Sequence, residues 1–252
     1  MRANTLREIW AAGKTAVNGW LHIPSSWSAE IMAHAGWDSL TVDLQHGLAD
    51  YQAAVTMFQA IATTATVPLA RSTWNDPAQI MRLLDAGAYG VICPMINSRA
   101  EAEAFVGACR YPPLGYRSLG PTRASVYAGA DYARYANETI VTLAMIETQP
   151  ALDNLDDILA TPGLDGVFVG PGDLGLSLTG QTGMDMSEPA LAQALAHIGK
   201  TARANGRIAG IWVPDVAAGQ AMVQLGYQFI TVSTDTRLLN TAAQTIVKEM
   251  KP

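Results

Sequence analysis

The sequence is short of cysteine, of positive charge and of long apolar runs, and each shortage excludes a class of protein. Its only two cysteines, Cys93 and Cys109, fall in an expected apolar strand and in the helix after it. Two such thiols suit a reducing compartment better than a disulfide framework, and they form no metal motif. No apolar run approaches the roughly 18 residues that span a bilayer, and the N-terminus reads as an amphipathic helix rather than a secretory signal. We therefore expect a cytoplasmic protein without a membrane partner.

Sixteen Lys and Arg residues stand against 22 Asp and Glu residues, which gives a net charge of -6. Binding a phosphate backbone requires the opposite balance, so nucleic acid is not an expected partner. Hydrophobic residues make up 49% of the chain and charged residues 15%. This balance is typical of a globular protein with a large core and not of a disordered chain.

What the chain has is a regular alternation of two periodicities. Short apolar or β-branched runs are each followed by a segment with helical spacing. The expected strands cover residues 15–23, 39–44, 67–72, 90–95, 140–147, 166–170, 208–213 and 229–234. The expected helices cover residues 26–35, 50–63, 76–86, 98–109, 150–160, 187–204, 214–225 and 235–249.

Eight strands alternating with helices in 252 residues match an α/β protein of the (β/α)8 TIM-barrel class. A doubly wound sheet uses the same local pattern and is the alternative. No linker or shift in composition marks a second domain, so we expect a single barrel domain over residues 1–252 that starts with a helix. The longest interruption, residues 111–137, is rich in Pro, Gly and Tyr and is expected to be an extended loop with one short helical piece.

Polar residues follow several of the expected strands at the point where each strand ends. Glu147 ends the fifth strand and Asp173 follows the sixth. Because the carboxyl ends of parallel strands meet on one rim of a barrel, the two acids could share a cation. Oxygen ligands with open positions suit Mg²⁺ or Mn²⁺, with Co²⁺ as a third candidate. Alternatively, each acid is a solvated loop carboxylate or a helix cap.

Other rim residues allow two interpretations each. Arg71 ends the third strand and either forms a structural ion pair or binds a substrate oxyanion. His46, which follows Asp43 and the second strand, either is structural or serves as an acid or base. Gly172 lies in a turn that enters a short helix, where free backbone N–H groups could bind a substrate carboxylate.

Two tryptophans and one further acid complete the set of candidates. Trp20 and Trp212 lie near strand ends and either pack in the core or line the mouth of the site. Asp85, near the end of the third helix of the alternation, has no role that the pattern alone assigns.

The sequence lacks the residues that two classes of catalytic site require. A Schiff-base enzyme needs a lysine at the site, and the four lysines all lie away from the expected carboxyl ends of strands. A three-histidine zinc centre lacks ligands, because only His22 and His46 lie near that rim. The remaining economical chemistry is an enolate held on a divalent ion that carboxylates bind.

Six segments, in their order and spacing, resemble the HpcH/HpaI family of metal-dependent pyruvate aldolases, and the resemblance covers nearly the whole chain. The segments are Val42-Asp43-Leu44-Gln45-His46-Gly47, Pro68-Leu69-Ala70-Arg71, Leu83-Leu84-Asp85-Ala86-Gly87-Ala88, Tyr111-Pro112-Pro113-Leu114-Gly115-Tyr116-Arg117, Met145-Ile146-Glu147-Thr148 and Val169-Gly170-Pro171-Gly172-Asp173-Leu174.

The resemblance implies a barrel of the phosphoenolpyruvate/pyruvate type that reversibly cleaves 4-hydroxy-2-oxo acids to pyruvate, or hydroxypyruvate, and an aldehyde. By the same resemblance, Glu147 and Asp173 hold the metal and Arg71 stabilises the enolate oxygen. His46, oriented by Asp85, is the implied base. A cytoplasmic homohexamer that exchanges its last helix between neighbours, and a role in the breakdown of aromatic compounds, are also implied.

Two departures from the family pattern affect the site. Gln45 stands where relatives commonly have Glu, and Met145 stands where they often have Gln. Two other functions stay open: a lyase for acyl-CoA esters or another enolate-forming lyase on the same barrel, and a metabolite-binding protein without catalysis.

Overall fold

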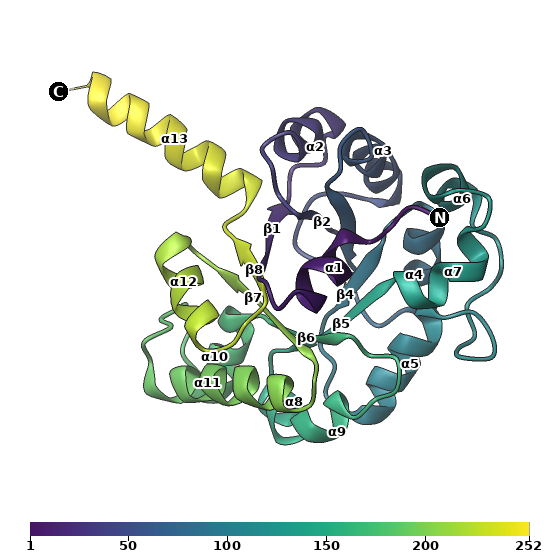
Figure 1. Cartoon of the computed structure of the whole chain (residues 1–252). Coiled ribbons are helices and arrows are strands. Elements are labelled where there is room, and N and C mark those ends of the chain that lie inside the picture. The colour runs from purple at the N-terminus through teal and green to yellow at the C-terminus, as the bar shows by residue number, and fades with distance from the viewer. Residues whose placement is uncertain (252) are drawn as a thin grey trace.

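The computed structural model describes residues 1–251 and forms a closed barrel of eight parallel strands (Figure 1). Each strand pairs with the next one in the chain, and β8 pairs with β1. This closing pair confirms the predicted TIM barrel and excludes an open doubly wound sheet. The strands are β1 (Ala16–Leu21), β2 (Ser39–Asp43), β3 (Val67–Arg71), β4 (Gly90–Cys93), β5 (Val141–Ile146), β6 (Gly166–Val169), β7 (Ile208–Val213) and β8 (Phe229–Val232).

Helices surround the barrel, and α1 lies across its opening in Figure 1. The Trp10 indole of α1 donates a hydrogen bond to the Gln228 carbonyl and packs edge-on against Phe229 at the start of β8. The helix α1 therefore closes the end of the barrel at which the strands begin. The helices are α1 (Thr5–Ala11), α2 (Ser26–Ala33), α3 (Tyr51–Ile61), α4 (Pro77–Asp85), α5 (Arg99–Cys109), α6 (Thr122–Ala128), α7 (Tyr132–Thr139), α8 (Gln149–Asp153), α9 (Leu155–Leu159), α10 (Pro171–Thr179), α11 (Pro189–Ala204), α12 (Val216–Gln224) and α13 (Asp235–Met250).

The strands are short and almost entirely buried, as strands of a parallel sheet covered on both faces must be. Seven of the eight end one or two residues before the predicted boundary. Glu147 and Gly170, for example, lie just past β5 and β6 and not within them. The chain leaves the ladder at the rim, and this frees the side chains there to face a ligand.

Residues 111–137 contain more helix than predicted. Two helices, α6 and α7, occur in and just after this segment instead of one short piece. Gly129, with φ of 110°, turns the chain between them. Ala124, Ala128 and Ala136 are buried, and this sparse apolar spacing is easily missed among polar and aromatic residues. The predicted helix 150–160 is likewise divided, at Asn154, into α8 and α9.

The last helix, α13, projects away from the barrel (Figure 1). Only Asp235 of its residues is buried, and its two carboxylate oxygens accept hydrogen bonds from the backbone N–H groups of His22 and Ile23. The first turn is thereby fixed to the end of β1. No helix within residues 1–251 is both long enough and apolar enough to cross a membrane.

Candidate functional site

A cavity of about 320 Å³ opens at the rim where the strands end. Its lining includes six residues that the sequence predicted to meet: Trp20, His46, Arg71, Gly172, Asp173 and Trp212. These residues come from the loops and strand ends of β1, β2, β3, β6 and β7. The structure therefore brings together groups that are far apart in the chain, at the end of the barrel that carries active sites in this fold.

Asp43 and Arg71 form a bidentate ion pair at the floor of this rim. Arg71 donates from Nε to Oδ1 of Asp43 at 2.8 Å and from Nη2 to Oδ2 at 2.6 Å. Asp43 is fully buried. Burial would raise the pKa of its carboxyl, but hydrogen bonds from His22 and Arg71 outweigh that effect and hold the pKa well below its usual range. Arg71 therefore forms the structural ion pair and also faces the cavity, where it can bind an oxyanion, so its two suggested roles are compatible.

Two further donors fix the Asp43 carboxylate. The Trp20 indole donates to Oδ2 at 3.1 Å, and Nε2 of His22 lies 2.9 Å from the same oxygen. Trp20 is buried, stacks on Phe168 with 5.5 Å between ring centroids, and carries the Arg71 guanidinium 5.0 Å above its ring. Trp20 therefore both packs in the core and lines the cavity, so its two suggested roles are not exclusive.

His46 and Gln45 follow β2 in a tight turn over the strand end. The backbone N–H groups of both residues donate to Oδ1 of Asp43. A Cβ on Gly47 would lie 2.2 Å from the Asp43 carbonyl oxygen, so only glycine allows this approach. The turn places the His46 ring on the cavity wall.

Glu147 fits a metal ligand better than a structural acid. Its Oε1 accepts a hydrogen bond from the Met95 backbone N–H at 2.7 Å, while its buried Oε2 has no hydrogen-bond partner among residues 1–251. Burial raises the pKa of this carboxyl to about 7, and the nearby Asp173 carboxylate adds to the rise. An unpartnered buried carboxylate oxygen beside a second acid is costly unless a cation neutralises both.

The turn after β6 leaves room for that cation. A Cβ on Gly170 would lie 2.6 Å from Oε2 of Glu147, so a side chain there would fill the space beside the orphaned oxygen. Gly170 also precedes α10, whose first turn has no side-chain cap. The free N–H groups around Gly172 face the cavity rim, where they can bind a carboxylate. Among residues 1–251, no three His, Cys, Asp or Glu side chains gather as a metal site.

Asp85 does not meet the other candidates within one chain, and its orientation of His46 stays a prediction. It ends α4, a helix that returns toward the start of the barrel strands, and it is absent from the cavity lining. Its carboxylate accepts a hydrogen bond from Arg117 at 2.6 Å, and Arg117 also donates to the Tyr132 hydroxyl. Burial raises the pKa of Asp85 despite the pairing with Arg117.

Several cavity residues were not singled out from the sequence. His22 was placed near the rim without a partner, and Phe168, Met184 and Arg237 were not proposed at all. His22 and Phe168 belong to the ends of strands, so their position could have been found from the same rule. Met184 and Arg237 reach the cavity from a loop and a helix, for which strand periodicity gives no signal.

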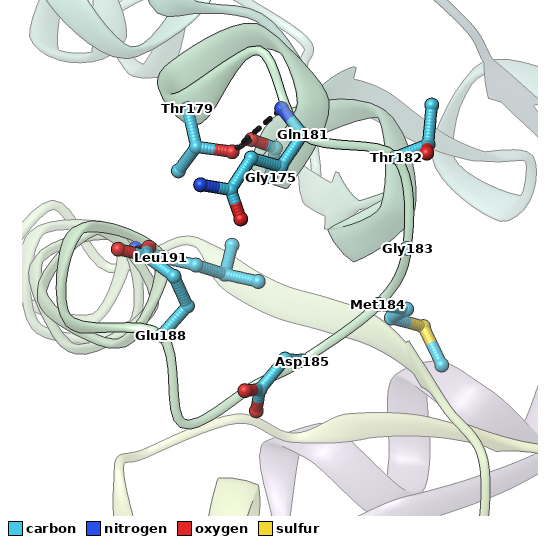
Figure 2. A pocket seen from close by; sticks show the side chains of 9 residues that line it. All are labelled: Gly175, Thr179, Gln181, Thr182, Gly183, Met184, Asp185, Glu188 and Leu191. Carbon is cyan, nitrogen blue, oxygen red and sulfur yellow. Dashed lines mark hydrogen bonds between the residues drawn. The ribbon is translucent and has the colours of Figure 1, made fainter.

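Figure 2 shows a second, smaller cavity of about 210 Å³. Met184 lines both cavities. The acids of the second cavity cap their own chain: Asp185 accepts hydrogen bonds from the Ser187 N–H and hydroxyl, and Glu188 accepts one from the Leu191 N–H. We assign no chemistry to this cavity.

The family model for HpcH/HpaI aldolase/citrate lyase matches residues 19–242. A hydroxypyruvate/pyruvate aldolase of Rhizorhabdus wittichii is 40% identical over 248 residues, which cover 98% of this chain and 99% of that protein. A 4-hydroxy-2-oxo-heptane-1,7-dioate aldolase of Salmonella arizonae is 38% identical over 96% of this chain and 93% of its own. A crystal structure of a HpcH/HpaI aldolase/citrate lyase family protein from Burkholderia cenocepacia J2315 has a TM-score of 0.93 and 30% identity, with 99% and 100% of the two chains covered.

Proposed function

This chain belongs to the HpcH/HpaI aldolase/citrate lyase family and is an aldolase, and from this premise we propose the residues and the substrates of its reaction. The enzyme reversibly cleaves 4-hydroxy-2-oxo acids to an aldehyde and either pyruvate or hydroxypyruvate. The observation that carries this proposal is the orphaned Oε2 of buried Glu147, beside Asp173 and below the cavity that Arg71 lines.

Glu147 and Asp173 would hold a divalent cation, for which Mg²⁺, Mn²⁺ and Co²⁺ are the candidates. When bound, the cation supplies Lewis-acid polarisation of the 2-oxo acid. The N–H groups at Gly172 and the first turn of α10 bind and orient the carboxylate of that acid. Trp20 and Trp212 line the walls of the cavity and exclude water.

Arg71 faces the charge that develops during cleavage. As the bond between C3 and C4 breaks, its electron pair moves toward the keto oxygen, and the guanidinium is already held in place by Asp43. Its Nη1 makes no hydrogen bond within residues 1–251 and remains available to that oxygen. Preorganised donors of this kind usually contribute the largest share of rate enhancement.

His46 serves as the base that removes the proton of the C4 hydroxyl, and the enolate left by cleavage takes up a proton at C3 to leave as the 2-oxo acid. The reverse reaction retraces both proton transfers. Its ring lines the cavity, and its backbone is fixed to Asp43. Within its own chain, Asp85 pairs with Arg117 and does not orient the His46 ring. In this proposal Asp85 can orient only the His46 ring of a neighbouring copy in an assembly.

We also propose a cytoplasmic homohexamer in which α13 packs on another copy. The helix exposes Leu239, Ile246 and Met250 on its surface, at 62–78% of their full areas. Their spacing of seven and four residues places them on one face. A helix with an exposed apolar face of this kind requires a partner surface in water. We also propose that residues 1–252 form one domain and that the enzyme acts in the breakdown of aromatic compounds.

The two other functions have less support. Two curated relatives that match almost the full chain are both named aldolases, which disfavours a binding protein without catalysis. The neighbour named a citrate lyase beta subunit is 15% identical with a TM-score of 0.59, and at that distance the likeness shows the fold alone.

The test is aldol addition of pyruvate, and in parallel hydroxypyruvate, to a short aldehyde before and after exhaustive chelation. Activity should vanish on chelation and return with Mn²⁺ or Mg²⁺. In the variants Glu147→Gln and Asp173→Asn, the affinity for Mn²⁺, measured by electron paramagnetic resonance, should fall more than about 100-fold. Loss of a residue that only supports a metal ligand costs about 10- to 100-fold in affinity, so a larger loss identifies a direct ligand. Full activity of the demetallated protein would overturn the proposal.

A further inference from the structure

Arg237 is a cation in the candidate site without a partner of its own. It lies in the first turn of α13 and lines the main cavity. Its guanidinium forms no ion pair and donates no hydrogen bond within residues 1–251, and it lies 5.7 Å from the centroid of the Trp212 ring.

The position of Arg237 is fixed by its surroundings. The first turn of α13 is bound to the end of β1 by Asp235, and Thr234 caps the helix by accepting the backbone N–H of Arg237. The Trp212 indole donates to the Ser233 carbonyl at 3.1 Å, which fixes the ring beneath the guanidinium. The backbone of Arg237 and the ring beneath its guanidinium are therefore fixed, while the side chain is exposed at the mouth of the cavity and available to a ligand.

The other charges of the cavity have partners. Arg71 is neutralised by Asp43, and the acids Glu147 and Asp173 would be neutralised by the divalent cation. Within residues 1–251, Arg237 is the one positively charged side chain of the lining without a partner of opposite charge, so an anionic ligand can bind to it. Asp173 follows β6 and Arg237 follows β8, so β7, which carries Trp212, separates the two positions on the rim.

We propose that Arg237 binds an anionic group at the far end of the aldehyde, a carboxylate or a phosphate ester. This inference rests on the proposed aldolase function. With the 2-oxo acid at Asp173 and Gly172, the aldehyde extends across β7 along Trp212 and Met184 and ends at Arg237. A guanidinium suits either anion because it donates two parallel hydrogen bonds.

The experiment compares two pairs of aldehydes in aldol addition of pyruvate by the metal-loaded enzyme. Succinic semialdehyde is paired with butanal, and glyceraldehyde 3-phosphate with glyceraldehyde. The ratio of kcat/KM for the charged aldehyde to that for its neutral partner should fall at least about tenfold in Arg237→Met for one pair, mainly through KM. Which pair responds identifies the anion. The matched control is Arg134→Met, an arginine that stacks on Tyr135 away from the cavity, and it should leave both ratios unchanged.

Unchanged ratios in Arg237→Met, with wild-type turnover intact, would overturn this inference and leave the aldolase function standing. A raised KM for pyruvate with equal losses for charged and neutral aldehydes would also overturn it, because Arg237 would then act on the 2-oxo acid. Absence of carbon-carbon bond formation with all four aldehydes would instead overturn the proposed function, and this inference with it.

Discussion

Asp43 is the residue on which most of the site geometry depends. Its two carboxylate oxygens accept hydrogen bonds from the side chains of Arg71 and Trp20 and from the backbone of the turn that carries His46. Because Asp43 is fully buried, its charge is stable only while these donors remain. The residue that holds Arg71 in place is therefore also one that the fold cannot leave unpaired.

Arg71→Ala should lower both activity and stability. The loss of the donor costs about 10²- to 10³-fold in kcat, and the loss of the charged partner of the buried Asp43 carboxylate costs about 3–5 kcal/mol of unfolding free energy. Denaturant unfolding and aldol kinetics measure the two effects. The double variant Arg71→Met with Asp43→Asn removes both charges, so it should recover stability without activity. Near-normal turnover in either variant would contradict the role given to Arg71.

The helix α13 buries only Asp235 of its residues. Its first turn is fixed to the rim, whereas the rest has no partner in the chain. Helical propensity alone does not stabilise a helix of this length in water, so the remainder of α13 is expected to be stable only in an assembly. In the proposed assembly the same helix would contribute Arg237 to its own site and an apolar face to another copy.

Leu239→Glu combined with Ile246→Glu should reduce the oligomeric mass measured by light scattering. Charges on the exposed apolar face cannot be desolvated at an interface, while the barrel strands do not contact these positions. Circular dichroism should lose at most the helical signal of α13, because only Asp235 of this helix is buried against the barrel. The control Asn240→Asp adds a charge to the same helix outside that face and should keep the wild-type mass. An unchanged mass in the double variant would exclude α13 as the oligomer contact.

At the scale of the whole molecule, the proposed metal site would link metal binding to folding through Glu147. The buried carboxyl has a pKa near 7 in the metal-free protein, above its ordinary value of 4.5. The folded state therefore holds this proton more tightly than the unfolded state does. As the pH rises from about 4.5 to 7, the metal-free protein loses stability, and above 7 the effect is constant. A cation competes with that proton.

Added Mn²⁺ should therefore raise the melting temperature more at pH 7.5 than at pH 5.5. At a free Mn²⁺ concentration 100 times Kd, the free energy of unfolding rises by about 2.7 kcal/mol. Below pH 7, protonation of Glu147 weakens the affinity for Mn²⁺ and raises Kd. Differential scanning calorimetry with and without Mn²⁺ measures both increments. Glu147→Gln should show no increment at either pH. Equal wild-type increments at the two pH values would contradict the role of Glu147 as a ligand.

The sequence alone determined the barrel and most of the rim. Alternating periodicities depend on local side-chain spacing, and parallel strands place their carboxyl ends together whatever the packing details. For that reason Arg71, His46, Glu147 and Asp173 were predicted as neighbours, and three of these four line the cavity with Glu147 directly below it. The lengths of the strands were overestimated because apolar patterns continue into rim loops after the ladder ends.

Only the tertiary structure decided which partner each charged side chain of the site has. No spacing rule says that Asp43 pairs with Arg71 and His22, that Asp85 turns instead to Arg117, or that Arg237 reaches the cavity from α13. Such pairings depend on which side chains meet across elements distant in the chain, and on which charges burial leaves without water. Local sequence sets the direction of a strand or helix, but desolvation and contact in the closed barrel choose the partner.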